Sequence, residues 1–192
     1  MKLQISKKNF KKTEIIFSVS FLVTTVSTLI CLFLKKEDLK NILLTFFVLL
    51  PIFASLIYLA YYDFKKMEVH PTLSLLLIIV LGIANILLFI FKKDNGLGYD
   101  NLLGAITLGV VFQLIVLLTK EKGLGQGDVR IAIISGVLVG FSNLIPWLYI
   151  TVFSSLIYGI GLTIKKKKFK GLKIPFVPFM VLGIIVTVLM GL

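Results

Sequence analysis

Long apolar runs dominate this sequence and constrain its fold more than any other feature. Runs of about twenty apolar residues match the roughly 30 Å hydrocarbon core of a bilayer, at about 1.5 Å per helical residue. Only helices and closed barrels satisfy their backbone hydrogen bonds in lipid, and the alternating pattern of barrel strands is missing here. The sequence therefore predicts an all-α fold, a polytopic membrane helix bundle of about seven transmembrane helices. The runs lie near residues 14–34, 42–62, 72–91, 101–119, 129–142, 145–164 and 175–191.

The composition leaves little sequence outside these runs. Hydrophobic residues make up 58% of the 192 residues, above their usual share in a soluble domain. We expect two parts: a basic N-terminus with one extra helix, residues 1–40, and a membrane core, residues 41–192. Cys31 is the only cysteine and His70 the only histidine, so we expect neither a metal nor a cofactor.

Lysine and arginine are unevenly distributed between alternate loops. If the N-terminus is cytoplasmic, the inner segments hold most of the 21 basic residues, before residue 14 and at 65–66, 120–130 and 165–173. Positive residues accumulate in cytoplasmic loops, so the sequence predicts an N-in, C-out orientation in the cell membrane. The net charge of +12 then suits anionic lipids at the inner face. We expect no nucleic-acid partner, because no aromatic-interleaved soluble surface is present to read bases.

Two aspartates stand at the cytoplasmic ends of predicted helices. Asp63 follows the second apolar run and Asp128 precedes the fifth, so both lie at one depth. Two neighbouring carboxylates cannot both ionise easily, so the ionised one can deprotonate water while the protonated one donates to a carbonyl. The pair is a candidate site for peptide hydrolysis without a covalent intermediate. Each aspartate alone is more simply a helix-end or turn residue, so the hypothesis depends on the combination.

Three glycines, Gly123, Gly125 and Gly127, precede Asp128 at every second position. Glycine lets the backbone turn sharply and lets another chain approach closely. We therefore expect a tight turn before Asp128, open to an extended substrate.

A stripe of small residues follows on the same predicted helix. Ala132, Gly136 and Gly140 recur at four-residue intervals, which lets a neighbouring membrane helix pack at short distance. We expect that neighbour to be the second helix, which carries Ala60 and Asp63.

The two aspartates stand at opposite kinds of helix end. A helix dipole favours an anion near the N-terminus and a neutral acid near the C-terminus. Asp128 begins a predicted helix and Asp63 ends one. We hypothesise that Asp128 starts as the base and Asp63 as the acid.

Several other polar residues have simpler interpretations. The stretch 95–100 resembles the glycine stretch, but it lies on the outer side, and we interpret it as a turn. His70, beside Pro71, is expected in a loop or interface. Asn85 and Gln113 lie within predicted helices, where hydrogen bonds between helices are the expected role.

Three segments resemble, in order, the signatures of the type IV prepilin peptidase family. Members of this family are GxGD-type membrane aspartyl proteases. The three segments are Asp63 with its basic loop, Gly-Leu-Gly-Gln-Gly-Asp-Val-Arg at 123–130, and Ile-Pro-Phe-Val-Pro-Phe at 174–179. The resemblance covers about residues 45–190. It implies that Asp63 and Asp128 are the catalytic pair and that the active site faces the cytoplasm.

The resemblance also implies a substrate. This is a prepilin or prepilin-like protein with a short basic leader, cut after a glycine just before its hydrophobic helix. Pro175, Phe176 and Pro178 would break the start of the last helix near the site and line the substrate, although a plain helix entry is an equally simple interpretation.

The chain departs from the family pattern in two places. Many members carry an Ile-Pro-Asn-like sequence after the first aspartate, where this chain has Val69-His70-Pro71-Thr72. Larger bacterial members also carry an N-terminal region with cysteine pairs, associated with N-methylation of the product. Only one helix precedes the core here, so we expect a short form that cleaves without methyl transfer.

Two other functions agree with parts of the sequence. Presenilin-like and signal-peptide-peptidase-like proteases also carry a Gly-x-Gly-Asp, but their aspartates lie on consecutive helices, whereas two runs separate them here. A small transporter or scaffold would need polar residues deeper in the helices, and few are present. A basic leader would also meet a basic inner face, unless Glu68, Glu121 and the aspartates form a local acidic pocket.

Overall fold

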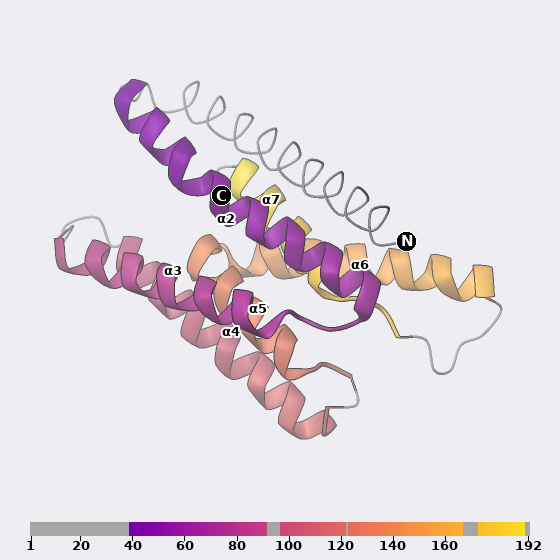
Figure 1. Ribbon diagram of the computed structural model, residues 1–192. Helices are drawn as coiled ribbons and strands as arrows, with labels where there is room; N and C mark the ends of the chain where they lie inside the picture. The colour runs from indigo at the N-terminus through magenta and orange to yellow at the C-terminus, as the bar shows by residue number, and fades with distance from the viewer. Residues whose placement is uncertain (1–38, 92–96, 122, 167–172, 191–192) are drawn as a thin grey trace, which may run out of the picture. The chain divides into compact units, whose positions relative to one another are not determined.

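The computed structural model describes residues 39–91, 97–121, 123–166 and 173–190 (Figure 1). Within these ranges the chain forms six α-helices and no strand, so the all-α prediction is confirmed for them. The predicted helix at 14–34 lies outside the described residues. The helices are α2 (Leu39–Lys66), α3 (Pro71–Phe91), α4 (Leu97–Thr119), α5 (Gln126–Val139), α6 (Leu144–Lys166) and α7 (Val177–Leu189).

Each of these helices coincides with one of the predicted apolar runs, to within a few residues at either end. By length and composition, Gly98–Thr119 and Leu144–Lys165 are long and apolar enough to cross a membrane. Large apolar side chains on α3, α4 and α6 remain exposed, among them Ile79, Leu118 and Ile157. An exposed apolar surface of this kind suits contact with lipid, so the chain is a membrane protein.

The chain divides into two compact units, with the boundary inside α2 between Tyr58 and Leu59. In the first unit the structure describes residues 39–58, where Pro51 lies within the helix and its carbonyl accepts a hydrogen bond from the Ser55 hydroxyl at 2.8 Å. The second unit contains the last turns of α2 and all the later helices. Both aspartates belong to this second unit. The division expected at residue 40 stays a prediction.

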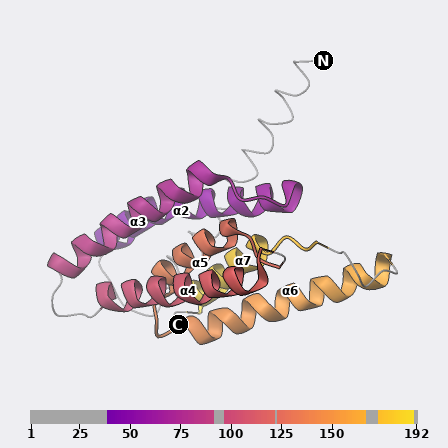
Figure 2. The same ribbon diagram turned by 90° about the horizontal axis from the view of Figure 1, so that it is seen from below.

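The most extensive helix pair of the second unit is α4 with α5 (Figure 2). A Cβ added to Gly104 would lie 2.5 Å from the Gly136 carbonyl oxygen, and one added to Gly136 would collide with the Gly104 carbonyl oxygen. The small-residue stripe on α5 therefore packs against α4. The expectation that α2 is its neighbour was wrong, because Gly104 supplies the complementary gap.

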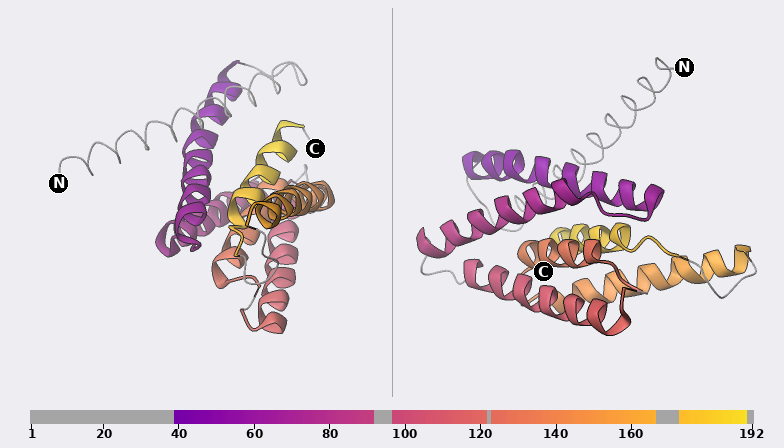
Figure 3. Two further views of the ribbon diagram at one scale, coloured as in Figure 1. Left: turned by 90° about the vertical axis from the view of Figure 1, so that its right-hand side faces the viewer. Right: turned by 60° about the horizontal axis from the view of Figure 1, so that its bottom comes forward.

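The central position of α5 explains why so short a helix is stable. It also packs against α3 and α7, and most of its side chains are buried (Figure 3). In turn, α7 packs closely on α6, where the fully buried Trp147 donates from Nε1 to the Met180 carbonyl at 3.2 Å. A Cβ on Gly183 would lie 3.0 Å from the Trp147 ring, so these two helices also meet at a glycine.

Asp100, in the first turn of α4, is hydrogen-bonded to Ser142 in the loop between α5 and α6, which is distant in sequence. Its Oδ1 accepts hydrogen bonds from the Ser142 hydroxyl at 2.8 Å and the Ser142 N–H at 3.1 Å. The interpretation of 95–100 as a turn was wrong for Asp100, because α4 begins at Leu97 and includes it. Nearby, Asn101 donates to Asn85 at 2.9 Å, which confirms the expected hydrogen bond between helices for Asn85.

Candidate active site

Asp63 lies in the last turn of α2, just after the apolar run that ends at residue 62. Its carbonyl accepts a hydrogen bond from the Met67 N–H at 2.8 Å, and Met67 adopts a left-handed backbone with φ 57° that ends the helix. The Asp63 side chain is only 5% exposed. The carboxyl group thus follows an apolar run directly and is buried.

The partner that makes this burial tolerable is the start of α7. The Val177 N–H donates to Asp63 Oδ2 at 3.1 Å. Val177 is the first residue of α7, where N–H groups lack partners within the helix and can bind an anion. The sequence analysis missed Val177, because its contribution comes from the backbone; the flanking prolines, which signal a helix start, were the available clue.

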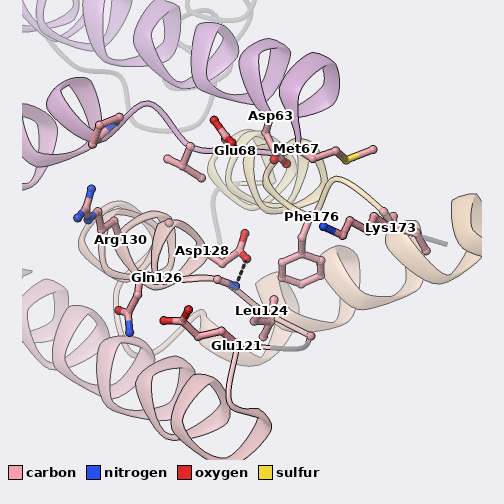
Figure 4. A pocket seen from close by; sticks show the side chains of 16 residues that line it. Asp63, Met67, Glu68, Glu121, Leu124, Gln126, Asp128, Arg130, Lys173 and Phe176 are labelled. Carbon is pink, nitrogen blue, oxygen red and sulfur yellow. Dashed lines mark hydrogen bonds between the residues drawn. The ribbon is translucent and has the colours of Figure 1, made fainter. Parts of the chain in front are cut away.

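Asp128 is the third residue of α5. Its Oδ2 accepts the Gly125 N–H at 2.9 Å, and the Gly125 carbonyl accepts the Asp128 N–H at 3.0 Å. The carboxylate therefore caps its own helix, as an acidic residue at this position commonly does. Its second oxygen, Oδ1, points away from this bond and toward Asp63 in Figure 4.

The three glycines before Asp128 differ in what they do. Gly125 has φ −96°, an extended conformation open to any residue, and Gly127 already lies within α5, whereas the chain bends at Gly123 and Leu124. At Gly127 the need is for space, since an added Cβ would lie 2.6 Å from Val69 Cγ2. At Gly123 an added Cβ would meet nothing within 4 Å.

The two aspartates line one pocket of about 840 Å³ (Figure 4). Its walls come from the end of α2, the loops that follow α2 and α4, the first turn of α5 and the segment before α7. The sequence separates these segments widely. Helices α3, α4 and α7 pack against α5, and the Val177–Asp63 hydrogen bond joins the end of α2 to the start of α7. Pairing Asp63 with Asp128 was a sequence prediction, and both side chains point into this pocket.

Burial raises the pKa of both carboxyl groups. It is the main cause at Asp63, where the Val177 N–H acts against it and the nearby charge of Asp128 adds to it, so that the pKa of Asp63 rises to about 6. Burial also raises the pKa of Asp128, against the Gly125 N–H bond. One of the two groups can thus hold a proton near neutral pH while the other is ionised.

The pocket concentrates negative charge. The structure describes five of the nine acidic residues of the chain, and four of them line this pocket: Asp63, Glu68, Glu121 and Asp128. Arg130 and Lys173 are the basic residues among the lining groups. A strongly basic chain therefore carries a local acidic surface around the two aspartates.

The proline segment lies beside the pocket. Phe176 lines the pocket, and its ring packs against Phe112 of α4 with the ring centroids 6.3 Å apart. Pro175 is buried and Pro178 is the second residue of α7, and neither is among the lining residues. Leu124 also lines the pocket and was missed, because a leucine between glycines carries no signal of its own.

The remaining polar candidate, His70, has a structural partner. Its Nδ1 accepts the Leu73 N–H at 3.4 Å near the start of α3, and its ring meets the edge of Tyr62 with centroids 5.4 Å apart. Among the described residues, no three His, Cys, Asp or Glu side chains cluster in a way that could hold a metal ion.

Comparison with known families gives one match. The model of the type IV leader peptidase family matches residues 50–160, a segment that contains both aspartates and ends before the proline segment. Neither the curated proteins nor the solved structures gave a match.

Proposed function

The chain belongs to the type IV leader peptidase family and is a peptidase of the membrane, and on that premise we propose that it removes the short basic leader of prepilin-like proteins. It would act as an aspartyl endopeptidase at the cytoplasmic face and cut after a glycine. The observation that carries the proposal is the placing of Asp63 and Asp128, from distant helices, in one pocket with raised pKa values.

In the proposed reaction, ionised Asp128 takes a proton from a water molecule as the water oxygen attacks the scissile carbonyl carbon. Protonated Asp63 donates its proton to the carbonyl oxygen. The tetrahedral intermediate then breaks its C–N bond, the oxygen returns its proton to Asp63, and Asp128 passes its proton to the leaving nitrogen. Both aspartates end as they began, as a catalytic cycle requires.

The assignment of the acid now rests on burial. The dipole argument from the sequence was incomplete, because Asp63 also meets the N-terminus of α7, which favours the anion. Its near-complete burial and pKa of about 6 still support Asp63 as the proton donor.

The pH dependence of cleavage follows from this assignment. As the pH rises through about 6, Asp63 loses the proton that it must donate, so kcat/KM should fall up to tenfold per pH unit above that point. At the acidic limit Asp128 becomes protonated, and because burial raises its pKa, activity should be lost at a higher pH than for an ordinary aspartate. We expect a bell-shaped profile for the purified enzyme with a peptide substrate. A rate that keeps rising to pH 9 would contradict Asp63 as the acid.

The acidic residues that line the pocket are a reason to propose that the substrate leader is basic. Lysine or arginine side chains of a substrate would find Glu68 and Glu121 close to the two aspartates. Glu121 follows the end of α4 with a left-handed backbone, φ 59°, a conformation that glycine adopts more easily. The basic segments at 65–66 and 120–130 flank the same pocket, so the positive-inside rule supports a cytoplasmic position for it, in an N-in, C-out bundle.

The apolar residues of the pocket are a reason to propose that the substrate residue before the cleaved bond is glycine. Phe176 and Leu124 lie on the same side of the carboxyl groups in Figure 4. A substrate residue without a side chain can bring its carbonyl carbon close to both aspartates beside these bulky groups.

The test is cleavage of a model prepilin, co-expressed in a host that lacks this activity. The substrate carries a lysine-containing leader that ends in glycine, and a second version carries glutamate in place of each lysine. We expect the native enzyme to cut the basic leader after the glycine, and the acidic leader at least tenfold more slowly. Gel shift and N-terminal sequencing of the product measure the result.

Charge-changed enzymes separate the two parts of the proposal. The double variant Glu68→Gln, Glu121→Gln should cut both leaders at similar rates, and Glu68→Lys, Glu121→Lys should prefer the acidic leader. Equal preference in all three enzymes would reject recognition by these glutamates. If the native enzyme cuts neither leader, the prepilin substrate itself is wrong.

A further inference from the structure

The short loop between α2 and α3 crosses the first turn of α5 at Val69. A Cβ added to Gly127 would lie 2.6 Å from Val69 Cγ2 and 2.7 Å from Val69 Cβ. Both distances are well below the roughly 3.5 to 4 Å of ordinary carbon contacts. The side chain of Val69 thus rests directly on the glycine backbone, with no space for a side chain at position 127.

The two residues of this contact are tied closely to the two aspartates. Gly127 immediately precedes Asp128 in α5, and Val69 follows Asp63 by six residues. The loop has little freedom between these points. At the start of the loop the Met67 N–H donates a hydrogen bond to the Asp63 carbonyl, and at its end His70 Nδ1 accepts the Leu73 N–H. A shift of Val69 is therefore passed on to the last turn of α2.

A second tie holds Asp63 to a different helix. The Val177 N–H fixes the Asp63 carboxylate against α7. That bond connects Asp63 to α7 and not to α5, whereas the Val69 contact connects the loop that follows Asp63 to α5. The distance between the two carboxyl groups thus depends on how closely the loop approaches α5.

We propose that Val69, resting on Gly127, is a positioning residue that sets the separation of the two aspartates. This inference rests on the proposed function only for its kinetic consequences. It gives a role to the loop in which the chain departs from the family pattern. Valine fills the space over a glycine backbone, and a larger group on either side would push the two carboxyl groups apart.

The variant Gly127→Ala tests the contact directly. Its new Cβ should push Val69 away and widen the separation of the aspartates, and kcat should fall by about ten- to a hundredfold, as misplacement of catalytic groups by about 1 Å does. Gly161→Ala is the matched control, because a Cβ there would meet nothing within 4 Å and α6 carries no residue of the pocket. Thermal unfolding in detergent shows whether each variant is folded.

Rescue by a second substitution distinguishes positioning from simple damage to the helix. In Val69→Ala, Gly127→Ala the two Cβ atoms would still lie 2.7 Å apart, so we expect little recovery. In Val69→Gly, Gly127→Ala the new Cβ would instead meet the Cα of residue 69 at 3.7 Å, an ordinary contact, and most of kcat should return. Equal activity of the two double variants would overturn the proposal.

A readout independent of cleavage keeps the inference separate from the proposed function. The carboxylic acid C=O stretch of Asp63, identified by its loss in Asp63→Asn, can be titrated by infrared difference spectroscopy. Because the charge of Asp128 raises the pKa of Asp63, wider separation should move this titration to lower pH in Gly127→Ala. It should return toward the native position in Val69→Gly, Gly127→Ala. An unchanged titration in folded Gly127→Ala would refute the positioning role, even if no prepilin is cut.

Discussion

Asparagine in place of Asp63 or Asp128 should abolish leader cleavage, with a loss of about a thousandfold or more in kcat/KM for either variant. A neutral amide at position 128 cannot take a proton from water, and an amide at position 63 cannot donate a carboxylic acid proton to the scissile carbonyl. General acid or base catalysis by one group contributes about 10²- to 10⁴-fold, and the two groups act as a unit. The model prepilin with the basic leader, followed by gel shift, measures both variants.

The fold should survive these substitutions. An asparagine amide oxygen can still accept the Val177 N–H at position 63 or the Gly125 N–H at position 128. Asp100→Asn is the matched control, since it changes a carboxylate that binds Ser142 at the other end of α4 and lines no part of the pocket. It should cleave at the native rate. Cleavage at near-native rate by Asp63→Asn or Asp128→Asn would reject the two-carboxylate mechanism.

Among glycine-to-alanine substitutions in the described helices, Gly136→Ala should cause the largest loss of folding stability. Its Cβ would collide with the Gly104 carbonyl oxygen and would lie 2.6 Å from the Ala105 nitrogen. These are backbone atoms, which cannot turn aside as the end of a side chain can. Overpacking of this kind costs about 1 to 3 kcal/mol, and sometimes more, so we expect a loss near 3 kcal/mol and separation of α4 from α5.

Gly82→Ala provides the comparison for this prediction. It also adds one methyl group to a helix, but in α3 a Cβ would meet nothing within 4 Å. Alanine should there stabilise the helix by about 0.5 to 1 kcal/mol, because glycine is the more flexible residue. Thermal unfolding of the purified proteins in the same detergent gives the difference. Equal midpoints for the two variants would show that α4 and α5 are not held by this contact.

The sequence predicts the helices of this protein well, because apolar runs of membrane length leave the backbone few alternatives. It also predicts, from an expected common depth, that Asp63 and Asp128 lie near each other, and both line one pocket in the structure. Depth is a property that each helix carries by itself. The pairing could therefore be reached without any knowledge of which helices touch.

Contacts between particular helices were harder to predict. The stripe at Gly136 indicates that some helix packs closely, but a pattern on one helix does not identify its partner, and Gly104 of α4 proved to be that partner. Asp100 was assigned to a turn, whereas α4 already begins at Leu97, and its hydrogen bond to Ser142 joins residues that are distant in sequence. Val69 was noticed only as a departure from a family pattern, and its contact with Gly127 required the packed structure.

The donor that holds Asp63 is a peptide N–H, which has a consequence for how this site varies between relatives and in the laboratory. Any amino acid except proline offers the same N–H at position 177, so the contact places no demand on the side chain there. Alanine scanning would retain it and would report position 177 only through the packing of its buried side chain. Alanine scanning therefore does not test this hydrogen bond to Asp63, whereas backbone ester substitution at position 177 would.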